Sequence, residues 1–360
     1  MESDEPTARA TAPEQCHCSS SRRRFLSGLL AAGATGLSAC VGGVGARRPA
    51  TRVDTHRHFF TPRQNAIAEK TGEANALTRS WSVARTLDDM DKAGIATSIL
   101  SSVTFYTGGL SPAEARAASR DANEGGARLR SDHLGRFGLF ASLPLQDTEG
   151  ALREIEYALD ILHADGILLH TNYGDKWLGH AQYAPVMDEL NRRKAILYTH
   201  PQSASCCVNL QPAIPDSVIE FGADTTRAIV DIVFSGTAAR CPDLRFIFSH
   251  AGGAMPYLSE RLVRLPVTDP RLVPRVPRGV LTELRRFYYD TAWAANPMAL
   301  SSLTRLVGIS QVLLGSDHPY RTGEDNVAGL AACDFTPAEL TAIERENAAR
   351  LMPRLNQLLS

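Results

Sequence analysis

The sequence lacks three features that would assign the protein to a familiar setting: a long hydrophobic run, a paired-cysteine framework and an excess of one charge. Its apolar run near the N-terminus is shorter than the roughly 20 residues that span a bilayer, so no permanent transmembrane helix is expected. The seven cysteines are odd in number and form no disulfide framework or CxxC zinc pattern. A formal net charge of −1, without a dominant basic stripe, excludes nucleic acid as an expected partner.

The composition that is present supports a well-packed body. Of the 360 residues, 44% are hydrophobic and 21% are charged, which are ordinary proportions for a globular protein. The length exceeds that of a common single domain, but α/β barrels often use about 250 residues or more as one domain. We therefore predict one large domain, residues 51–360, behind a short leader and linker, residues 1–50.

The leader has the order of features that is typical of an export signal. A twin-arginine pattern, SRRRFLS with Arg22 and Arg23, precedes the apolar run GLLAAGATGLSAC, which ends at Cys40. The last four letters of that run also resemble a lipobox, in which Cys40 becomes lipidated, and an alternative cleavage site follows Ala46. The competing interpretation is a disordered cytosolic N-terminus. We predict twin-arginine export to the periplasm, or a lipoprotein whose only membrane contact is Cys40.

In the body of the chain, short β-rich runs alternate with helical stretches, and this alternation is typical of a parallel α/β fold. Eight β/α units predict a TIM barrel. The Pro- and Arg-rich stretch at 264–279 interrupts the alternation, so we predict a surface insertion after the sixth strand. The eight candidate strands are TRVDTHRH (51–58), IATSILSSV (95–103), GRFGLFASL (135–143), DGILLHTN (165–172), AILYTHP (195–201), RFIFSHAGG (245–253), RFYYDTA (286–292) and QVLLGSDHP (311–319).

Most of these strands begin apolar and end in His, Asp, Asn or Ser. Active sites of such barrels lie at the carboxyl ends of the strands, so polar residues far apart in the sequence are expected to converge on one mouth. These residues are His56 and His58 on the first strand, His170 and Asn172 on the fourth, His200 on the fifth, His250 on the sixth, Asp290 on the seventh and Asp317 on the eighth.

Four of these residues form a candidate metal site. Residues i and i+2 of a strand point to the same side, so His56 and His58 both face the barrel lumen. His200 and Asp317 complete a set of three nitrogens and one carboxylate oxygen. This set suits Zn²⁺ first and Mn²⁺ second. A pair of polar surface histidines is the alternative for the HxH pattern alone, but the matching ends of the other strands favour one metal ion.

His250, in FSHAGG, follows an almost purely apolar strand and is predicted to stand beside the metal as a general acid/base. A further metal ligand or a core histidine is the alternative for this residue. Asn172 is predicted to orient the substrate by hydrogen bonding. Trp293 and Tyr106 are predicted to line the substrate pocket, although core packing explains each of them equally well.

These residues lie in stretches that carry a family resemblance. From about residue 51 to its end, the chain resembles the amidohydrolase-related group that includes aminocarboxymuconate-semialdehyde, γ-resorcylate and 6-methylsalicylate decarboxylases. The resemblance implies that His56, His58, His200 and Asp317 are metal ligands and that His250 is the catalytic histidine. His318 is a departure, because many relatives have an aromatic residue after the aspartate. The stretches are DTHRHF, TNYGDKWLG, ELNRRKAILYTHP, DTTRAIVDIVFSGTAARCPDLRFIFSHAGGAMP and LLGSDHPY.

The expected activity is metal-dependent, non-oxidative decarboxylation of an aromatic or enolic carboxylic acid, such as a 6-methylsalicylate-like hydroxybenzoate. Either His250 or Asp317 would help to protonate the carbon that carries the carboxylate. The alternative is metal-dependent hydrolysis of a lactone, ester or amide, with Asp317 as proton acceptor. A third interpretation is a lipid-anchored binding protein without turnover. The resemblance also implies a homodimer, for which the 264–279 insertion offers a contact surface.

Overall fold

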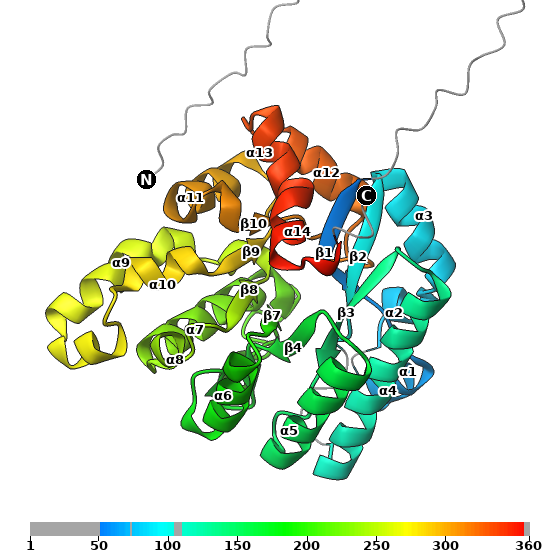
Figure 1. Ribbon diagram of the computed structural model, residues 1–360, viewed down its shortest axis with the longest axis horizontal. Coiled ribbons are helices and arrows are strands. Elements are labelled where there is room, and N and C mark those ends of the chain that lie inside the picture. The colour runs from blue at the N-terminus through cyan, green and yellow to red at the C-terminus, as the bar shows by residue number, and fades with distance from the viewer. Residues whose placement is uncertain (1–50, 73, 104–109, 356–360) are drawn as a thin grey trace, which may run out of the picture. The chain divides into compact units, whose positions relative to one another are not determined.

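The computed structural model describes residues 51–72, 74–103 and 110–355, all within one compact unit, Arg48–Ser360. Eight parallel strands follow one another around this unit in the order β1-β2-β3-β4-β7-β8-β9-β10, and helices surround them (Figure 1). The predicted TIM barrel is confirmed. The predicted leader with Cys40 and the predicted pocket residue Tyr106 lie outside the described residues.

Each of the eight predicted strands has a counterpart in the barrel, and a short hairpin is added after β4. The strands are β1 Arg52–His58, β2 Ile95–Ser101, β3 Phe137–Ser142, β4 Gly166–His170, β5 Asn172–Tyr173, β6 Lys176–Trp177, β7 Ile196–His200, β8 Arg245–Phe248, β9 Tyr288–Asp290 and β10 Val312–Leu313. The α-helices are α1 Pro62–Thr71, α2 Ala76–Ser80, α3 Val83–Ala93, α4 Pro112–Asp132, α5 Thr148–Glu156, α6 Ala184–Arg192, α7 Glu220–Phe234, α8 Thr237–Arg240, α9 Met255–Thr268, α10 Val280–Arg286, α11 Pro297–Val307, α12 Gly323–Ala331, α13 Pro337–Thr341 and α14 Asn347–Leu351.

Local sequence explains where these helices begin. Ahead of α4, the Ser111 hydroxyl accepts a hydrogen bond from the main-chain N–H of Glu114, and the Glu114 carboxylate accepts one from the Ser111 N–H. Ahead of α5, the Asp147 carboxylate caps the helix by accepting from the Gly150 N–H. The helical segment that follows β3 thus begins as α5 and continues through a π-helical turn, Tyr157–Ile161.

All eight strands are shorter than predicted, and the sixth and the eighth differ most, because the backbone beyond their ends leaves the extended conformation. The predicted sixth strand, 245–253, stops at Phe248 because His250 and Ala251 have φ values of 54° and 56°, which a strand cannot contain. The predicted eighth strand, 311–319, stops at Leu313, and Asp317 has a φ of 65°. His250 and Asp317 therefore stand on left-handed turns just beyond their strands.

The interior of the barrel is layered along its axis. The C-terminal residues close the amino end of the strands, since Leu351 O accepts a hydrogen bond from Arg245 at the start of β8 and Arg354 pairs with Asp165 just before β4. Above this plug lies a buried apolar cluster made of residues from the strands and from the C-terminal segment, including Val53, Ile99, Phe140, Leu168, Tyr198, Ile247, Leu313, Leu351 and Leu355. Because this apolar cluster fills the lower part of the barrel, the polar side chains gather at the carboxyl ends of the strands.

The barrel closes between its first and last strands through main-chain hydrogen bonds, beside an ion pair buried within β1. Thr55 N donates to Leu314 O at 2.8 Å, and Asp317 N donates to His56 O at 2.8 Å. The Arg57 guanidinium, fully buried, donates to Asp54 Oδ2 at 2.9 Å.

The same two charged side chains hold neighbouring segments in place. The Asp54 carboxylate also accepts hydrogen bonds from the main-chain N–H and the hydroxyl of Ser316, at 3.0 and 2.7 Å. Arg57 reaches a second carboxylate, that of Asp89, at 2.7 Å. This network ties β1 to the turn that carries Asp317.

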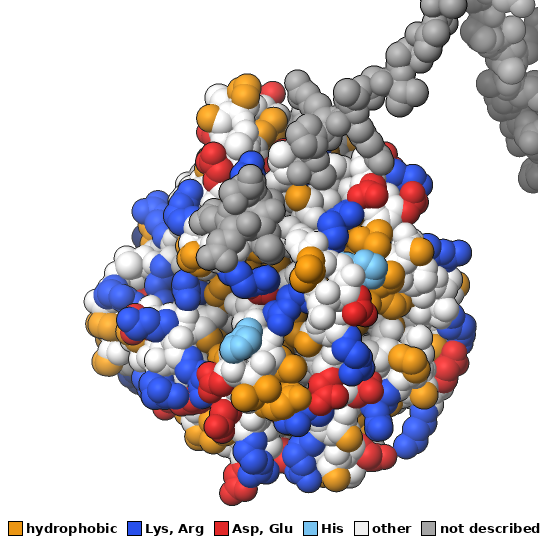
Figure 2. Space-filling view, turned by 45° about the vertical axis from the view of Figure 1, so that its right-hand side comes forward, with side chains coloured by type: hydrophobic (Ala, Val, Ile, Leu, Met, Phe, Trp, Pro, Cys, Tyr) orange, Lys and Arg blue, Asp and Glu red, His pale blue; other side chains and the backbone are white. Residues whose placement is uncertain are grey.

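The predicted insertion after the sixth strand lies on the surface and contains more helix than expected. α9 continues through Pro266 to Thr268, and a 3₁₀ helix, Pro270–Arg275, follows it. On the face that Figure 2 shows, basic and acidic side chains are interspersed. Within the described ranges, no helix combines the length and apolar character needed to cross a membrane.

We predict that Asp54→Asn lowers the free energy of unfolding by about 3–5 kcal/mol, the usual cost of removing one partner of a buried ion pair. Arg57 keeps its charge in this variant, but it loses one of the two carboxylates around it. Urea unfolding followed by circular dichroism measures the change. The control is Glu69→Gln, which breaks an ion pair with Arg79 in which both side chains are about half exposed, 52% and 55%, and should change little. Equal losses in the two variants would contradict the prediction.

Candidate metal centre

Four predicted metal ligands meet at the carboxyl ends of the barrel strands. His56 and His58 end β1, His200 ends β7, and Asp317 follows β10. One ligand atom from each side chain lies within 4.8 Å of the others, and all four residues are buried. The sequence prediction that these residues converge agrees with the geometry of the fold.

The three rings turn their Nε2 atoms toward one carboxylate oxygen. Asp317 Oδ1 lies 2.8 Å from His58 Nε2, 3.1 Å from His56 Nε2 and 3.9 Å from His200 Nε2. The Nε2 atoms of His56 and His58 are themselves only 3.1 Å apart. His200 Nε2 is buried and makes no hydrogen bond within the described part of the chain.

The other nitrogen of each ring explains this orientation. Nδ1 faces an oxygen in every case: Asp290 Oδ2 at 2.9 Å for His56, Pro201 O at 2.9 Å for His200, and both the hydroxyl and the main-chain oxygen of Ser101, at 3.1 and 3.4 Å, for His58. An imidazole that donates from Nδ1 to an oxygen presents Nε2 as an unprotonated acceptor. Three lone pairs and one carboxylate then face one point, and a divalent cation is the group that satisfies them. The donor set fits Zn²⁺ or Mn²⁺.

The charges around the cluster shift the pKa values of its members in opposite directions. Burial lowers the pKa of His56, but the carboxylates of Asp290 and Asp317 outweigh burial and raise it to about 10. Burial dominates at His58 and His200 and lowers both of their pKa values. The pKa of Asp317 is well below its usual value because, although burial raises it, His56 and the neighbouring histidines outweigh that effect.

Asp317 connects the cluster to the predicted general acid/base. Its second oxygen, Oδ2, lies 3.3 Å from His250 Nε2 and accepts a hydrogen bond from Trp293 Nε1 at 2.7 Å. The His250 main-chain N–H donates to Asp290 Oδ1 at 3.0 Å, which fixes the turn on which this histidine stands. The His56 side chain is fully buried, whereas those of Asp317 and His250 are 7% and 10% exposed. His250 is therefore the most exposed of these three side chains.

Two details of the backbone make this close convergence possible. His250, Trp293 and Asp317 all have left-handed φ values, 54°, 56° and 65°, on three different strand ends. Such strain, of the order of 1–3 kcal/mol per residue, often clusters at functional sites. At Gly315, an added Cβ would lie 2.9 Å from the Cβ atoms of His56 and of Asp290, so only glycine fits between them.

Of the two described residues that were predicted to contact the substrate, Trp293 lies at the site, whereas the Asn172 side chain is engaged by other residues. Trp293 lies at the site, 56% exposed, but its indole also binds a metal ligand, which sequence reasoning did not foresee. The Asn172 side chain is buried and donates to Asp224 Oδ2 at 2.6 Å and to Gln202 O at 3.1 Å, so its role toward substrate stays a prediction. Sequence reasoning also left Asp290 without a role, although its place at the end of the seventh strand was the available signal.

Fold and cluster together define a class of protein, a parallel eight-stranded barrel in which three histidines and one aspartate that could hold a metal ion meet at the carboxyl ends of the strands. The amidohydrolase family model matches residues 53–354, and the chain belongs to that family.

Individual relatives narrow the class. Decarboxylase yanB of Aspergillus niger is 35% identical over 323 residues, which cover 84% of this chain and 88% of that protein. The 6-methylsalicylic acid decarboxylase of Penicillium expansum is 32% identical over 318 residues, which cover 86% of this chain and 98% of that protein. These relatives confirm the predicted decarboxylase group and the predicted carboxy-lyase class, and they do not favour the hydrolase alternative.

A solved structure agrees on the fold. The dihydroxybenzoic acid decarboxylase from Polaromonas sp. JS666, with bound manganese and the inhibitor 2-nitroresorcinol, matches this chain with a TM-score of 0.75 at 22% identity. The match covers 85% of this chain and 97% of that structure.

We predict one divalent ion per chain, and its loss when His56 and His58 are both changed to Ala, because two of the four ligands disappear. Elemental analysis of purified protein by mass spectrometry measures the metal content. His163→Ala is the control, since His163 is an exposed residue outside the cluster, and it should keep the ion. Full metal content in the double variant would show that the metal binds elsewhere.

Proposed function

We propose that this protein is a metal-dependent, non-oxidative decarboxylase of a hydroxybenzoate of the 6-methylsalicylate kind. The observation that carries the proposal is the placement of His250 Nε2 3.3 Å from the outward oxygen of Asp317, whose other oxygen faces three imidazole nitrogens. A metal site beside an accessible proton donor is what such a reaction requires. The decarboxylases similar to this chain supply the substrate class.

His56, His58, His200 and Asp317 would hold the ion. When bound, a divalent cation supplies positive charge that orients the hydroxyl and carboxylate oxygens of the substrate and stabilises charge on them. Zn²⁺ is the first candidate from the donor set, and Mn²⁺ is the second. The manganese in the Polaromonas enzyme gives a reason to test both.

The chain itself then has to supply one proton to the substrate, and we assign this transfer to His250. In the proposed step, His250 donates a proton from Nε2 to the ring carbon that carries the carboxylate, and a C–H bond forms. The bond between that carbon and the carboxylate carbon breaks, its electron pair returns to the ring, and CO₂ leaves. The aromatic ring is restored, and His250 regains a proton from water. No oxidant or organic cofactor enters this balance.

We predict that His250→Asn keeps its metal and fold but decarboxylates 6-methylsalicylate about 10²–10⁴-fold more slowly, the usual loss for a general acid/base. Substrate binding should suffer less than turnover, because the metal ligands are intact. The measurement is CO₂ release at equal metal loading. His133→Asn is the control, because His133 packs on Phe137 at the opposite end of the barrel. If the unaltered protein releases no CO₂ from any hydroxybenzoate yet hydrolyses lactones or amides, the decarboxylase proposal is wrong and the hydrolase alternative is supported.

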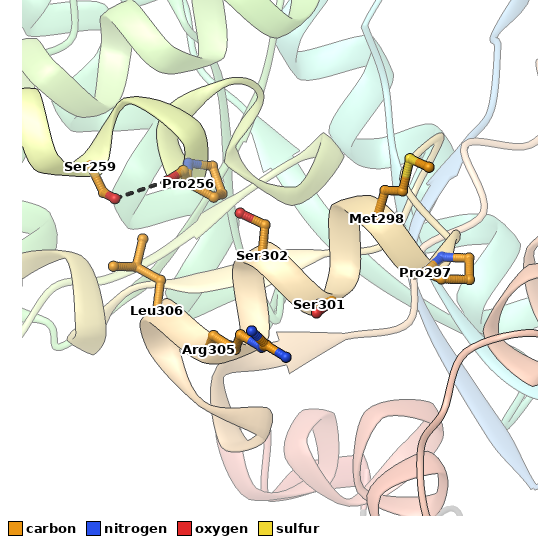
Figure 3. Close-up of a pocket in the computed structure, with 8 residues that line it drawn as sticks. All are labelled: Pro256, Ser259, Pro297, Met298, Ser301, Ser302, Arg305 and Leu306. Atoms are coloured by element: carbon orange, nitrogen blue, oxygen red, sulfur yellow. Dashed lines mark hydrogen bonds between the residues drawn. The ribbon is translucent and has the colours of Figure 1, made fainter.

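We also propose a homodimer that uses the surface around α9 and α11. A groove of about 750 Å³ lies between these helices, and Figure 3 shows Ser302 and Leu306 of α11 on the side nearest Pro256 and Ser259 of α9. Apolar side chains are strongly exposed nearby. Tyr257 and Met298 are each 88% exposed, and Val267, in the predicted insertion, is 75% exposed. A second copy of the chain is the occupant that the decarboxylase resemblance suggests.

Sedimentation at micromolar concentration should show a dimer, and the pair Tyr257→Glu and Met298→Glu should convert it to a monomer, because charge is then buried in an apolar contact. Leu134→Glu, at a residue that is 86% exposed elsewhere on the barrel, is the matched control. A monomeric parent protein, or a dimer that survives both substitutions, would count against this interface.

Export is proposed from the leader alone. Replacing Arg22 and Arg23 with Lys should leave the protein in the cytoplasm, because the twin-arginine pathway reads this pair. Cell fractionation measures the outcome. The second arginine pair, Arg47 and Arg48, offers a control, and its replacement with Lys should leave export unchanged. Normal export of the variant with Lys at positions 22 and 23 would contradict the proposal of twin-arginine export.

A further inference from the structure

The two oxygens of Asp317 have separate neighbours. Oδ1 faces the imidazole nitrogens, whereas Oδ2 accepts the indole N–H of Trp293 at 2.7 Å and lies 3.3 Å from His250 Nε2. We propose that Trp293 is a positioning residue, which holds Oδ2 away from the metal so that Asp317 binds through Oδ1 alone. A coordination position thereby stays open for an oxygen of the substrate. The substrate part of this inference rests on the proposed function, and the metal part does not.

The hydrogen bond is suited to this task. The terminal torsion of an aspartate is broad, so packing alone does not decide whether one or both carboxylate oxygens face a cation. An indole nitrogen is a donor only, and it cannot exchange roles with the carboxylate. A hydrogen bond to an ionised acceptor is also short and about twice as strong as a neutral one. Trp293 therefore fixes the tilt of the carboxylate, so that one oxygen stays with the indole and the other faces the imidazoles.

The backbone and a neighbouring cation keep the indole in place. Trp293 has a φ of 56°, a strained conformation that is unusual for a bulky aromatic residue. The Arg321 guanidinium lies over the indole ring, 5.7 Å from its centroid, and the Arg321 main-chain N–H donates to Asp317 O at 3.3 Å. Trp293 is nevertheless 56% exposed, so its conformation is set by these contacts more than by core packing.

Binding through a single oxygen of Asp317 increases the number of coordination positions that remain for the substrate. Three imidazoles and one carboxylate oxygen use four positions, which leaves about two on an ion such as Mn²⁺, which accepts about six ligands, and about one on Zn²⁺, which accepts up to about five. A hydroxybenzoate offers two oxygens, one from the hydroxyl and one from the carboxylate, for the positions that remain. If both oxygens of Asp317 bound the ion, one of these positions would be lost to the substrate.

The test compares Trp293→Phe with Trp177→Phe. Trp177 is a matched control, because its indole N–H also donates to a buried aspartate, Asp224, at 2.8 Å, but that aspartate is not among the four metal-binding residues. Each protein is loaded with Co²⁺, whose visible absorption weakens as its coordination number rises. We expect weaker absorption in Trp293→Phe than in the parent and the control, with one metal ion per chain in all three. Spectra that are identical in the three proteins would overturn the proposal.

Salicylate binding to the metal-loaded proteins is the second arm. We expect the dissociation constant to rise about 10–100-fold in Trp293→Phe, the range typical when a group that orients a metal ligand is removed. Trp293→Gln retains an N–H donor and should recover part of this loss. If instead metal affinity falls and salicylate affinity of the loaded protein is unchanged, Trp293 supports the ligand without keeping a position open, and the proposal is wrong. If the spectra differ as expected but the parent does not bind salicylate, the positioning role stands and the proposed substrate class fails.

Discussion

The structure depends on one electrostatic constraint, which is that three imidazole nitrogens and a carboxylate oxygen are buried and turned toward one another. The Nε2 atoms of His56 and His58 lie only 3.1 Å apart, a separation that two unprotonated nitrogens tolerate only when a cation or a proton lies between them. The surrounding contacts all act to impose it. Oxygens behind each ring fix the Nδ1 atoms, Gly315 lets His56 and Asp290 approach closely, and left-handed turns aim Asp317 and His250 inward.

Stability and function are coupled through the closure of the barrel. The Asp54 carboxylate joins buried Arg57, which lies between two metal ligands, to Ser316, which precedes a third. A buried ion pair such as that of Asp54 and Arg57 is weak evidence for stability, since the cost of desolvating the two charges offsets much of their attraction. Its position suggests a second benefit, because it holds β1 and the Asp317 turn in one register. The metal ligands are thus spaced by the fold before any ion arrives.

Much of the architecture and the metal cluster could be predicted from the sequence, because alternation of apolar strands with helices and polar strand ends are local patterns. The prediction failed where the backbone leaves ordinary conformations. Nothing in FSHAGG or LLGSDHP states that His250 and Asp317 have positive φ, so both strands were predicted too long. The contact of Trp293 was missed because its partner, Asp317, lies on the turn after the next strand, and the partner of Asn172 lies on α7. Such pairings are properties of the assembled fold.

The central claim is that the metal-loaded protein protonates a ring carbon and releases CO₂. The most direct measurement uses 6-methylsalicylate labelled with ¹³C in its carboxylate, incubated with the metal-loaded protein in D₂O. The account predicts labelled CO₂ and 3-methylphenol that carries deuterium on the carbon that lost the carboxylate. Unchanged substrate, with no labelled CO₂ from this or any related hydroxybenzoate, would contradict it.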